Sequence, residues 1–248
     1  MPYAAVSFPA SDGLRLDGWT VPSDPQRPWV IFCHGLGANR ADLLDFAAVL
    51  HGARFNLLLF DFRAHGSSAG QATSFGWREQ RDLEGALTFL GGQPEVPARP
   101  VGVFGVSMGG AVALMVAARD ERIAAVAVDS PYQDLDAAIR HYMGLMFPRL
   151  PIRPLVPFVL ATYRLRFGVW PRQVSAERAA RRLGRRPLLV FKATADPQLP
   201  PEGAEAIHRA AEGPKELVVM GAQAHLGSYA ADPEGYGMRL RRFFERAL

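Results

Sequence analysis

One pentapeptide constrains the fold of this chain more than any other feature. Residues 105–109 read Gly-Val-Ser-Met-Gly, after an apolar run typical of a buried strand and before an alanine-rich helical pattern. Glycines allow a sharp turn from strand to helix, and the turn leaves the central Ser107 strained at the helix N-terminus. The pentapeptide therefore predicts a strand-turn-helix unit that carries a reactive serine.

Short apolar runs alternate with helical patterns along the rest of the chain. This alternation predicts an α/β fold whose mainly parallel sheet is covered by helices on both faces. The first two predicted strands are separated by Ser11-Asp12-Gly13 and are expected to form an antiparallel hairpin. The predicted strands are residues 3–8, 14–21, 29–33, 56–60, 101–106, 124–128, 187–191 and 216–220. The predicted helices are residues 41–50, 77–90, 109–118, 202–211 and 233–247.

Residues 131–184 interrupt this alternation. They are too many for a connection inside a compact α/β domain, where about 2–6 residues is typical. We therefore expect a helical cap at 131–184, inserted into a core domain formed by 1–130 and 185–248. The middle of the cap is apolar, but prolines and four arginines interrupt it and argue against a membrane-spanning helix.

Charge is distributed unevenly. Residues 134–186 hold eleven arginines and three acidic residues, a net +8 in a chain whose total is +4. A surface this basic suggests an anionic substrate or peripheral contact with an anionic membrane surface, and the plainer alternative is a solvated helix face. The arginines lack regularly interleaved aromatic residues and a recognition motif, so nucleic acid is not an expected partner.

Cysteine usage and the first residues bear on the compartment. Cys33 is the only cysteine, which excludes an intramolecular disulfide and a cysteine cluster for zinc or iron–sulfur. Residues 1–12 lack a basic start followed by an apolar stretch. These features favour a cytoplasmic protein.

An activated serine needs a histidine base within hydrogen-bond reach. His225 is the preferred candidate because it follows the last predicted strand and precedes the last helix. His51 and His208 lie in helical patterns, where packing or surface roles are more common. The remaining histidines are His141 in the cap and His34 and His65 in loops.

The base in turn needs an acid that orients it. Asp196 lies just past the penultimate strand, where Pro197 favours an extended backbone. Asp129 ends another strand at the same edge of the sheet and is the alternative acid. We prefer Asp196.

A developing oxyanion needs preorganised N–H donors. In this geometry one donor is the amide of Met108, the residue after the nucleophile. The loop Cys33-His34-Gly35-Leu36-Gly37 is expected to supply the second from Leu36, because flanking glycines let that amide turn toward Ser107. We interpret His34 as a loop-shaping residue and Cys33 as a buried strand residue.

Together these motifs resemble the α/β-hydrolase fold, and within it bacterial serine hydrolases grouped with monoglyceride lipases and serine-aminopeptidase-like enzymes. The resemblance rests on residues 105–109, 34–37 and 61–68 and on the placement of Asp196 and His225. It implies an eight-stranded sheet with an antiparallel second strand, Ser107 as nucleophile, His225 as base, Asp196 as orienting acid, and the Leu36 and Met108 amides as oxyanion hole.

Two more expectations come from the resemblance. Arg63 and His65 belong to a loop that mainly supports the oxyanion side in such enzymes. Dehalogenases and epoxide hydrolases of this fold carry aspartate where this chain has Ser107, which argues against both activities.

The expected function is hydrolysis of a carboxylic ester or thioester of a small-molecule acyl substrate through an acyl-serine intermediate, without metal or organic cofactor. Amide, peptide or C–C bond hydrolysis and acyl transfer use the same residues and stay open. A non-catalytic scaffold that binds lipid or a partner through the basic cap is the alternative from another class. Seven apolar side chains of the cap are expected to face the acyl chain: Met143, Leu145, Met146, Phe147, Leu155, Phe158 and Val159.

Overall fold

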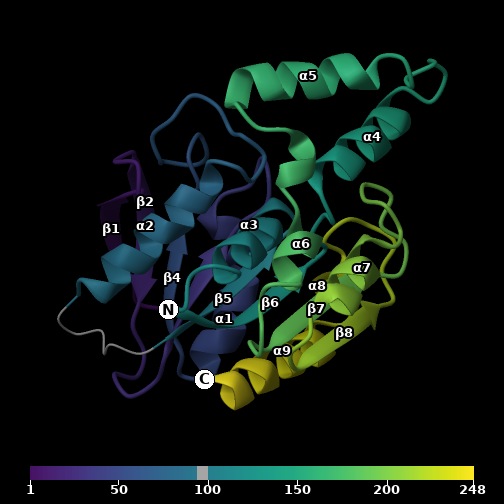
Figure 1. Ribbon diagram of the computed structural model, residues 1–248. Coiled ribbons are helices and arrows are strands. Elements are labelled where there is room, and N and C mark those ends of the chain that lie inside the picture. The colour runs from purple at the N-terminus through teal and green to yellow at the C-terminus, as the bar shows by residue number, and fades with distance from the viewer. Residues whose placement is uncertain (94–99) are drawn as a thin grey trace.

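Eight strands form one sheet in the computed structural model, which describes residues 1–93 and 100–248. The strands are β1 (Ala4–Pro9), β2 (Arg15–Val21), β3 (Trp29–Cys33), β4 (Asn56–Phe60), β5 (Val101–Val106), β6 (Ile123–Asp129), β7 (Leu188–Ala193) and β8 (Lys215–Met220). Their order across the sheet is β1-β2-β4-β3-β5-β6-β7-β8 (Figure 1). Strand β2 is antiparallel to both β1 and β4, and the other pairings are parallel. The structure confirms the predicted sheet.

Helices follow most of the strands. They are α1 (Leu44–Gly52), α2 (Glu79–Gly91), α3 (Met108–Ala117), α4 (Leu135–Met146), α5 (Val156–Phe167), α6 (Ala176–Ala180), α7 (Gly203–Ala210), α8 (Ser228–Ala231) and α9 (Pro233–Ala247). The helix predicted over 41–50 is split, because a 3₁₀ turn, η1 (Arg40–Leu43), precedes α1. A capping box at Asn39 starts this turn, since Asn39 accepts from Ala41 while Asp42 accepts from Asn39. A second 3₁₀ turn, η2 (Pro171–Gln173), lies between α5 and α6.

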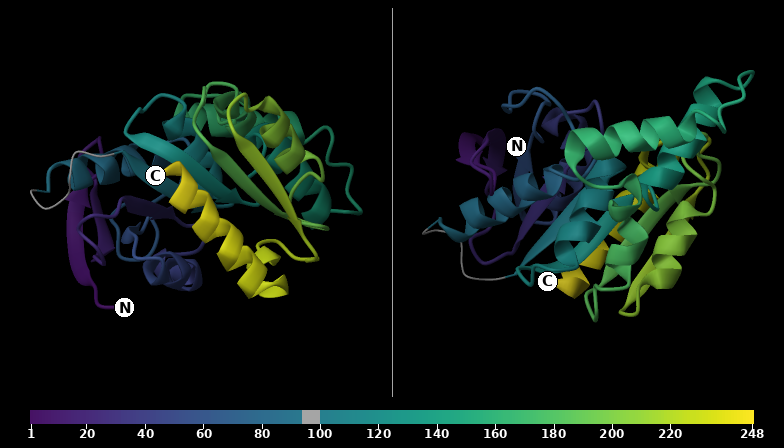
Figure 2. Two further views of the ribbon diagram at one scale, coloured as in Figure 1. Left: turned by 90° about the horizontal axis from the view of Figure 1, so that it is seen from below. Right: turned by 45° about the horizontal axis from the view of Figure 1, so that its top comes forward.

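The sheet is covered on both faces. Along β5, Val103 belongs to the buried cluster shared with α2, α3, α6 and α7, whereas Phe104 belongs to the cluster shared with α1 and α9. Adjacent side chains of a strand point to opposite faces, so a strand buried on both sides must be continuously apolar. Figure 2 shows the two helical layers on either side of the sheet.

Helices α4 and α5 extend beyond the sheet (Figure 1). Asp134 caps the start of α4 by accepting from the Ala137 amide at 2.8 Å. Helix α5 is joined to the loop before α2 by Tyr163, whose hydroxyl donates to the Ser74 carbonyl at 2.8 Å. Helix α6 packs against α3 and α7. Within the described residues, no helix is both long enough and apolar enough to cross a bilayer.

Candidate active site

Ser107 stands at the turn between β5 and α3. Its φ of 50° and ψ of −117° lie in a region that non-glycine residues rarely adopt. The neighbouring glycines are required by close approach, because a Cβ at Gly109 would lie 2.2 Å from the Cys33 carbonyl oxygen, and one at Gly105 would lie 2.5 Å from that of Gly109. Glycine at both positions therefore allows α3 to start against β3, with Ser107 at its positive end.

Two other side chains form a hydrogen-bonded chain with Ser107. His225 Nε2 lies 3.0 Å from Ser107 Oγ, and His225 Nδ1 lies 2.6 Å from Asp196 Oδ2. The side chains of His225 and Asp196 are 13% and 12% exposed, so solvent screens the contact between them only partly. With Nδ1–H donating to the carboxylate, Nε2 is free to accept the serine proton. The sequence predicted this placement of all three residues.

Asp129, the alternative acid, has different partners. Its Oδ1 accepts hydrogen bonds from Ser130 Oγ at 2.9 Å and from Ser228 Oγ at 3.2 Å. Burial raises the pKa of this carboxyl, and the hydrogen bonds offset part of that effect. Ser228 begins α8 just after His225, so Asp129 anchors the segment that follows the histidine, whereas Asp196 contacts the ring.

Two amides are predicted to face an oxyanion, those of Leu36 and Met108. Neither donates a hydrogen bond to another described residue. The Met108 amide is in the first turn of α3, where N–H groups have no intrahelical acceptor. The Leu36 loop approaches the serine, since a Cβ at Gly35 would lie 3.5 Å from Ser107 Cβ. Neither amide is therefore occupied by another described residue, and the Leu36 loop lies close to Ser107.

Two histidines support this loop from behind. His34 Nδ1 donates to the Gly35 carbonyl at 2.7 Å, and Nε2 accepts from the Phe62 amide at 2.9 Å. Burial lowers the pKa of His34 to about 4, so the ring is neutral at pH 7. His65 accepts from the Gly37 amide at 3.1 Å and donates to the Arg63 carbonyl at 2.8 Å. The predicted loop-shaping role of His34 is confirmed, and His65 supports the same loop.

Arg63 holds the adjoining loop through a buried ion pair. Its guanidinium lies 2.6 Å from fully buried Asp82 and 2.9 Å from Asp12. Arg63→Ala is expected to lower the free energy of unfolding by about 3–5 kcal/mol, because it leaves the Asp82 carboxylate buried without its cation. Urea denaturation measures the loss.

Arg15 provides a matched control. It pairs with Asp17 at 2.7 Å, but its side chain is 61% exposed. Arg15→Ala should cost no more than about 1 kcal/mol. If Arg63→Ala and Arg15→Ala lowered the free energy of unfolding equally, the buried Arg63–Asp82 pair would not be more stabilising than the exposed one.

The other candidate residues lie outside the hydrogen-bonded chain. His51 is in α1 and His208 in α7. His141 of α4 donates from Nε2 to the Pro197 carbonyl at 2.9 Å, beside Asp196. Cys33 is fully buried at the end of β3, and burial raises the pKa of its thiol.

Sequence reasoning missed the role of Glu79. This fully buried carboxylate accepts from Thr73 Oγ1, from the amide and hydroxyl of Ser74, and from the Gly76 amide, at 2.6–2.9 Å. It thereby orders the loop that receives Tyr163 of α5. The available signal was an acidic residue on the apolar face of the helix predicted over 77–90.

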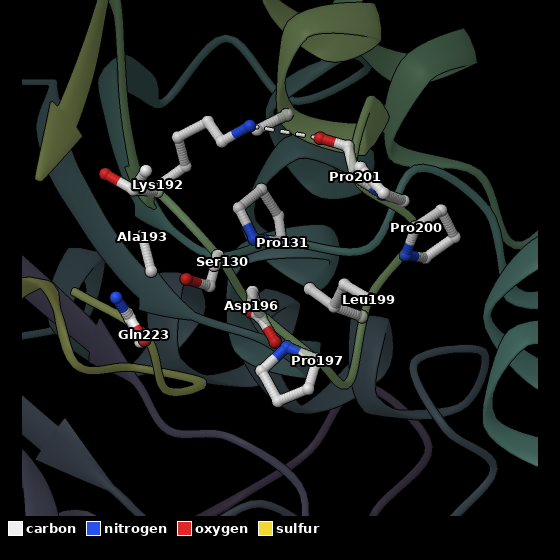
Figure 3. Close-up of a pocket in the computed structure, with 13 residues that line it drawn as sticks. Ser130, Pro131, Lys192, Ala193, Asp196, Pro197, Leu199, Pro200, Pro201 and Gln223 are labelled. Atoms are coloured by element: carbon white, nitrogen blue, oxygen red, sulfur yellow. Dashed lines mark hydrogen bonds between the residues drawn. The ribbon is translucent and has the colours of Figure 1, made fainter. Parts of the chain in front are cut away.

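A cavity of about 400 Å³ borders the acid side of the site. Figure 3 shows Ser130, Pro131, Asp196, Pro197, Leu199 and Gln223 around it. Ser107 and the seven cap side chains predicted to face an acyl chain are not among its lining residues. Six of those seven are exposed to solvent: Leu145, Met146, Phe147, Leu155, Phe158 and Val159.

In the part of the chain that the structure describes, no group of three or more His, Cys, Asp or Glu side chains is placed to hold a metal ion. The reactive side chains that the structure brings together here are those of Ser107, His225 and Asp196.

The chain is similar to known proteins over most of its length. The model of the alpha/beta hydrolase family matches residues 30–248. An uncharacterized protein of Mycobacterium tuberculosis is 32% identical over 241 residues, which are 96% of this chain and 78% of that protein. A thiohydrolase of Aspergillus aculeatus is 33% identical over 124 residues, which are 49% of this chain and 39% of that protein.

Among solved structures, the esterase Pf2001 of Pyrococcus furiosus is similar over 99% of this chain and 93% of its own, with a TM-score of 0.81 and 27% identity. This likeness spans the sheet and the strand ends at which Ser107, Asp196 and His225 lie. With the family model covering most of the chain, it follows that the chain belongs to the alpha/beta hydrolase family of enzymes.

Proposed function

We propose that the protein is a serine esterase that cleaves a carboxylic ester through an acyl-serine intermediate. Ser107 is the nucleophile, His225 the general base, and Asp196 the acid that orients the imidazole. The amides of Leu36 and Met108 form the oxyanion hole. The observation that carries this proposal is the chain of hydrogen bonds from Ser107 through His225 to Asp196, at 3.0 and 2.6 Å.

Acylation begins when Ser107 Oγ attacks the ester carbonyl carbon. The serine proton passes to His225 Nε2, and Asp196 stabilises the imidazolium that results. The carbonyl oxygen becomes an oxyanion that accepts hydrogen bonds from the two free amides. As the tetrahedral intermediate collapses, the bond to the leaving oxygen breaks and His225 returns its proton to the departing alcohol.

Deacylation repeats these steps with water. His225 removes a proton from the water that attacks the acyl carbon, and then protonates Ser107 Oγ as the acyl bond breaks. The products are the acid and the regenerated serine. Support for ester chemistry also comes from the similar esterase of Pyrococcus furiosus.

Thioester hydrolysis is the second candidate. The relative from Aspergillus aculeatus, a thiohydrolase, favours it over the half of the chain that the two proteins share. A thioester also places its carbonyl carbon and oxygen at Ser107 and the two amides, and differs only in the sulfur that leaves. The substrate panel that tests the proposal must therefore contain both esters and thioesters.

Residues 131–184 complete the proposal as a cap on a core formed by 1–130 and 185–248. Tyr163 and His141 support this division, because they join α5 and α4 to the loops on either side of the site. A cap joined to the core at these contacts and through α6, which packs against α3 and α7, would select the substrate without contributing a reacting group.

The proposal is tested by labelling the folded protein with a fluorophosphonate probe. We expect labelling of the wild type and none of Ser107→Ala, because the probe requires an activated serine. A panel of p-nitrophenyl esters of increasing acyl length, run beside matched thioesters, then identifies the preferred bond and chain length. Folded wild type that neither reacts with the probe nor cleaves any ester would favour the scaffold alternative.

A second test addresses the oxyanion hole. Gly37 has a φ of 74°, and its amide is held by His65 beside Leu36. Gly37→Val should move the Leu36 amide and lower kcat by about 100- to 1,000-fold, the usual cost of one lost oxyanion donor. Steady-state kinetics on the best p-nitrophenyl ester measure the change.

Gly13 is a matched control for backbone strain. It lies in the turn between β1 and β2 with a φ of 84° and, like Gly37, has nothing within 4 Å of an added Cβ. Both valine variants should lose similar stability, roughly 1–2 kcal/mol. Only Gly37→Val should lose turnover, so an unchanged kcat in that variant would contradict the assignment of Leu36.

A further inference from the structure

Exposed apolar side chains are concentrated on one part of the molecule. Among the described residues, sixteen large apolar side chains are exposed, and nine of them lie within residues 142–165. We call these nine side chains the α4–α5 face: Tyr142, Leu145, Met146, Phe147, Leu150, Leu155, Phe158, Val159 and Leu165. Clusters of this kind mark interaction surfaces, whereas single exposed apolar residues do not.

Helix α5 has an apolar stripe on each of two opposite sides. Its inner stripe holds the buried side chains of Val156, Leu160 and Tyr163. At about 100° per residue, Phe158 and Leu165 lie in line on the opposite side of the helix. Phe158 is 72% exposed and Leu165 is 89% exposed. A helix that is apolar on both sides normally has both sides covered.

Basic side chains dominate the charge around this face, although Asp136 near the start of α4 pairs with Arg140. Residues 137–176 contain six arginines and no aspartate or glutamate. At about 100° per residue, Arg164 and Arg166 fall on either side of the stripe formed by Phe158 and Leu165. Their guanidinium groups lie over the rings of Trp170 and Phe167, at 5.0 and 5.7 Å from the ring centroids. Apolar side chains flanked by arginines match the layering of an anionic lipid surface, where acyl chains lie beneath phosphates.

We propose that the α4–α5 face binds an anionic lipid surface, independently of the reaction at Ser107. Phe158 and Leu165 insert among the acyl chains, and the arginines contact the lipid phosphates. A second copy of this chain fits the face less well, because it would bring two arginine-rich surfaces together.

The α4–α5 face lies on the two helices that contact loops near Ser107 and Asp196. The loop between α4 and α5 reaches far from the sheet in Figure 1 and in the right-hand view of Figure 2. The opposite side of α5 contacts the loop ordered by Glu79 through Tyr163, and His141 of α4 contacts the loop after Asp196. Lipid bound at the face would therefore contact α4 and α5, the same helices that touch the loops near the site.

Flotation with vesicles tests the proposal without measuring activity. Wild type should bind vesicles in which about a third of the phosphatidylcholine is replaced by phosphatidylglycerol, and added salt should weaken binding. The double variant Phe158→Ser/Leu165→Ser should weaken binding by at least about a hundredfold, since it removes two inserted side chains. Arg164→Gln and Arg166→Gln should each weaken it about fivefold.

Matched variants elsewhere serve as controls. Val219→Ser/Met238→Ser replaces apolar side chains that are 54% and 53% exposed on β8 and α9, and Arg239→Gln removes a charge from α9. Both should bind as wild type does, with every variant folded by circular dichroism. The proposal is overturned by equal binding to pure phosphatidylcholine, by no binding to either vesicle, or by a dimer that Phe158→Ser/Leu165→Ser dissociates.

Discussion

Ser107→Ala is expected to lower kcat on the best p-nitrophenyl ester by about a millionfold, the largest effect of any single substitution proposed for this protein. The alanine variant has no oxygen to attack the carbonyl, and His225 then has nothing to activate. Binding and the two amides remain, so some acceleration over water should persist. Single-turnover and steady-state assays on the same ester measure the loss.

A distant serine provides the control. Ser7 on β1 donates to the Leu16 carbonyl at 3.1 Å and is remote from the β5–α3 turn. Ser7→Ala should keep wild-type turnover, and both variants should unfold as the wild type does. If Ser107→Ala retained even a hundredth of the activity, Ser107 would not be the nucleophile.

Asp196→Asn is expected to lower kcat by about 10,000-fold. The amide of asparagine presents N–H donors to His225 Nδ1, and this favours the imidazole tautomer whose Nε2 carries a proton. That tautomer cannot accept the proton of Ser107. Binding of substrate should change little, so KM should stay within about tenfold while kcat falls.

Asp129→Asn separates the two candidate acids. Asp129 contacts Ser130 and Ser228 and makes no hydrogen bond to His225 within the described chain, so its loss should weaken the α8 segment and leave most turnover intact. The asparagine variant should keep kcat within about tenfold of wild type. If instead Asp129→Asn were inactive and Asp196→Asn active, the assignment of the orienting acid would be wrong, although the serine mechanism would stand.

Most of the sheet was predictable from local sequence. Strands buried on both faces must be continuously apolar, and β3, β4 and β5 show this pattern at their predicted positions. The boundaries of α1 and α2 differ from the predicted ones, because capping and buried polar groups determine where these helices begin. Asn39 starts η1 before α1, and Glu79 holds the turn where the pattern predicted the first residues of α2.

The positions of Ser107, Asp196 and His225 were predictable for a topological reason. The carboxyl ends of parallel strands meet at one edge of the sheet, so residues just past β5, β7 and β8 lie close together without any local signal that joins them. Choosing Asp196 over Asp129 depended on loop geometry that sequence constrains only weakly. Glu79 left a local signal as an acidic residue on an apolar helix face, but the contact of its loop with Tyr163 of α5 could not be predicted from that pattern.

The arrangement of residues 131–184 was not predictable in the same way. An apolar residue such as Phe158 is equally compatible with a core, an acyl pocket or a lipid surface, because composition alone does not say what covers it. The structure leaves Phe158 facing solvent and buries Leu160 and Tyr163 of the same helix. The finer resemblance to monoglyceride lipases and serine aminopeptidases stays a prediction.

Labelling of Ser107 by the fluorophosphonate probe can also be used to follow the folding of the protein. Ser107 and His225 are 118 positions apart along the chain, and only the intact order of β5 through β8 brings them within 3.0 Å. A partly folded chain that had lost β8 would keep much of its helical signal and still lack a reactive serine. Probe labelling therefore reports on the integrity of the sheet from β5 to β8, and its decay on heating should follow the unfolding of this part rather than local fraying.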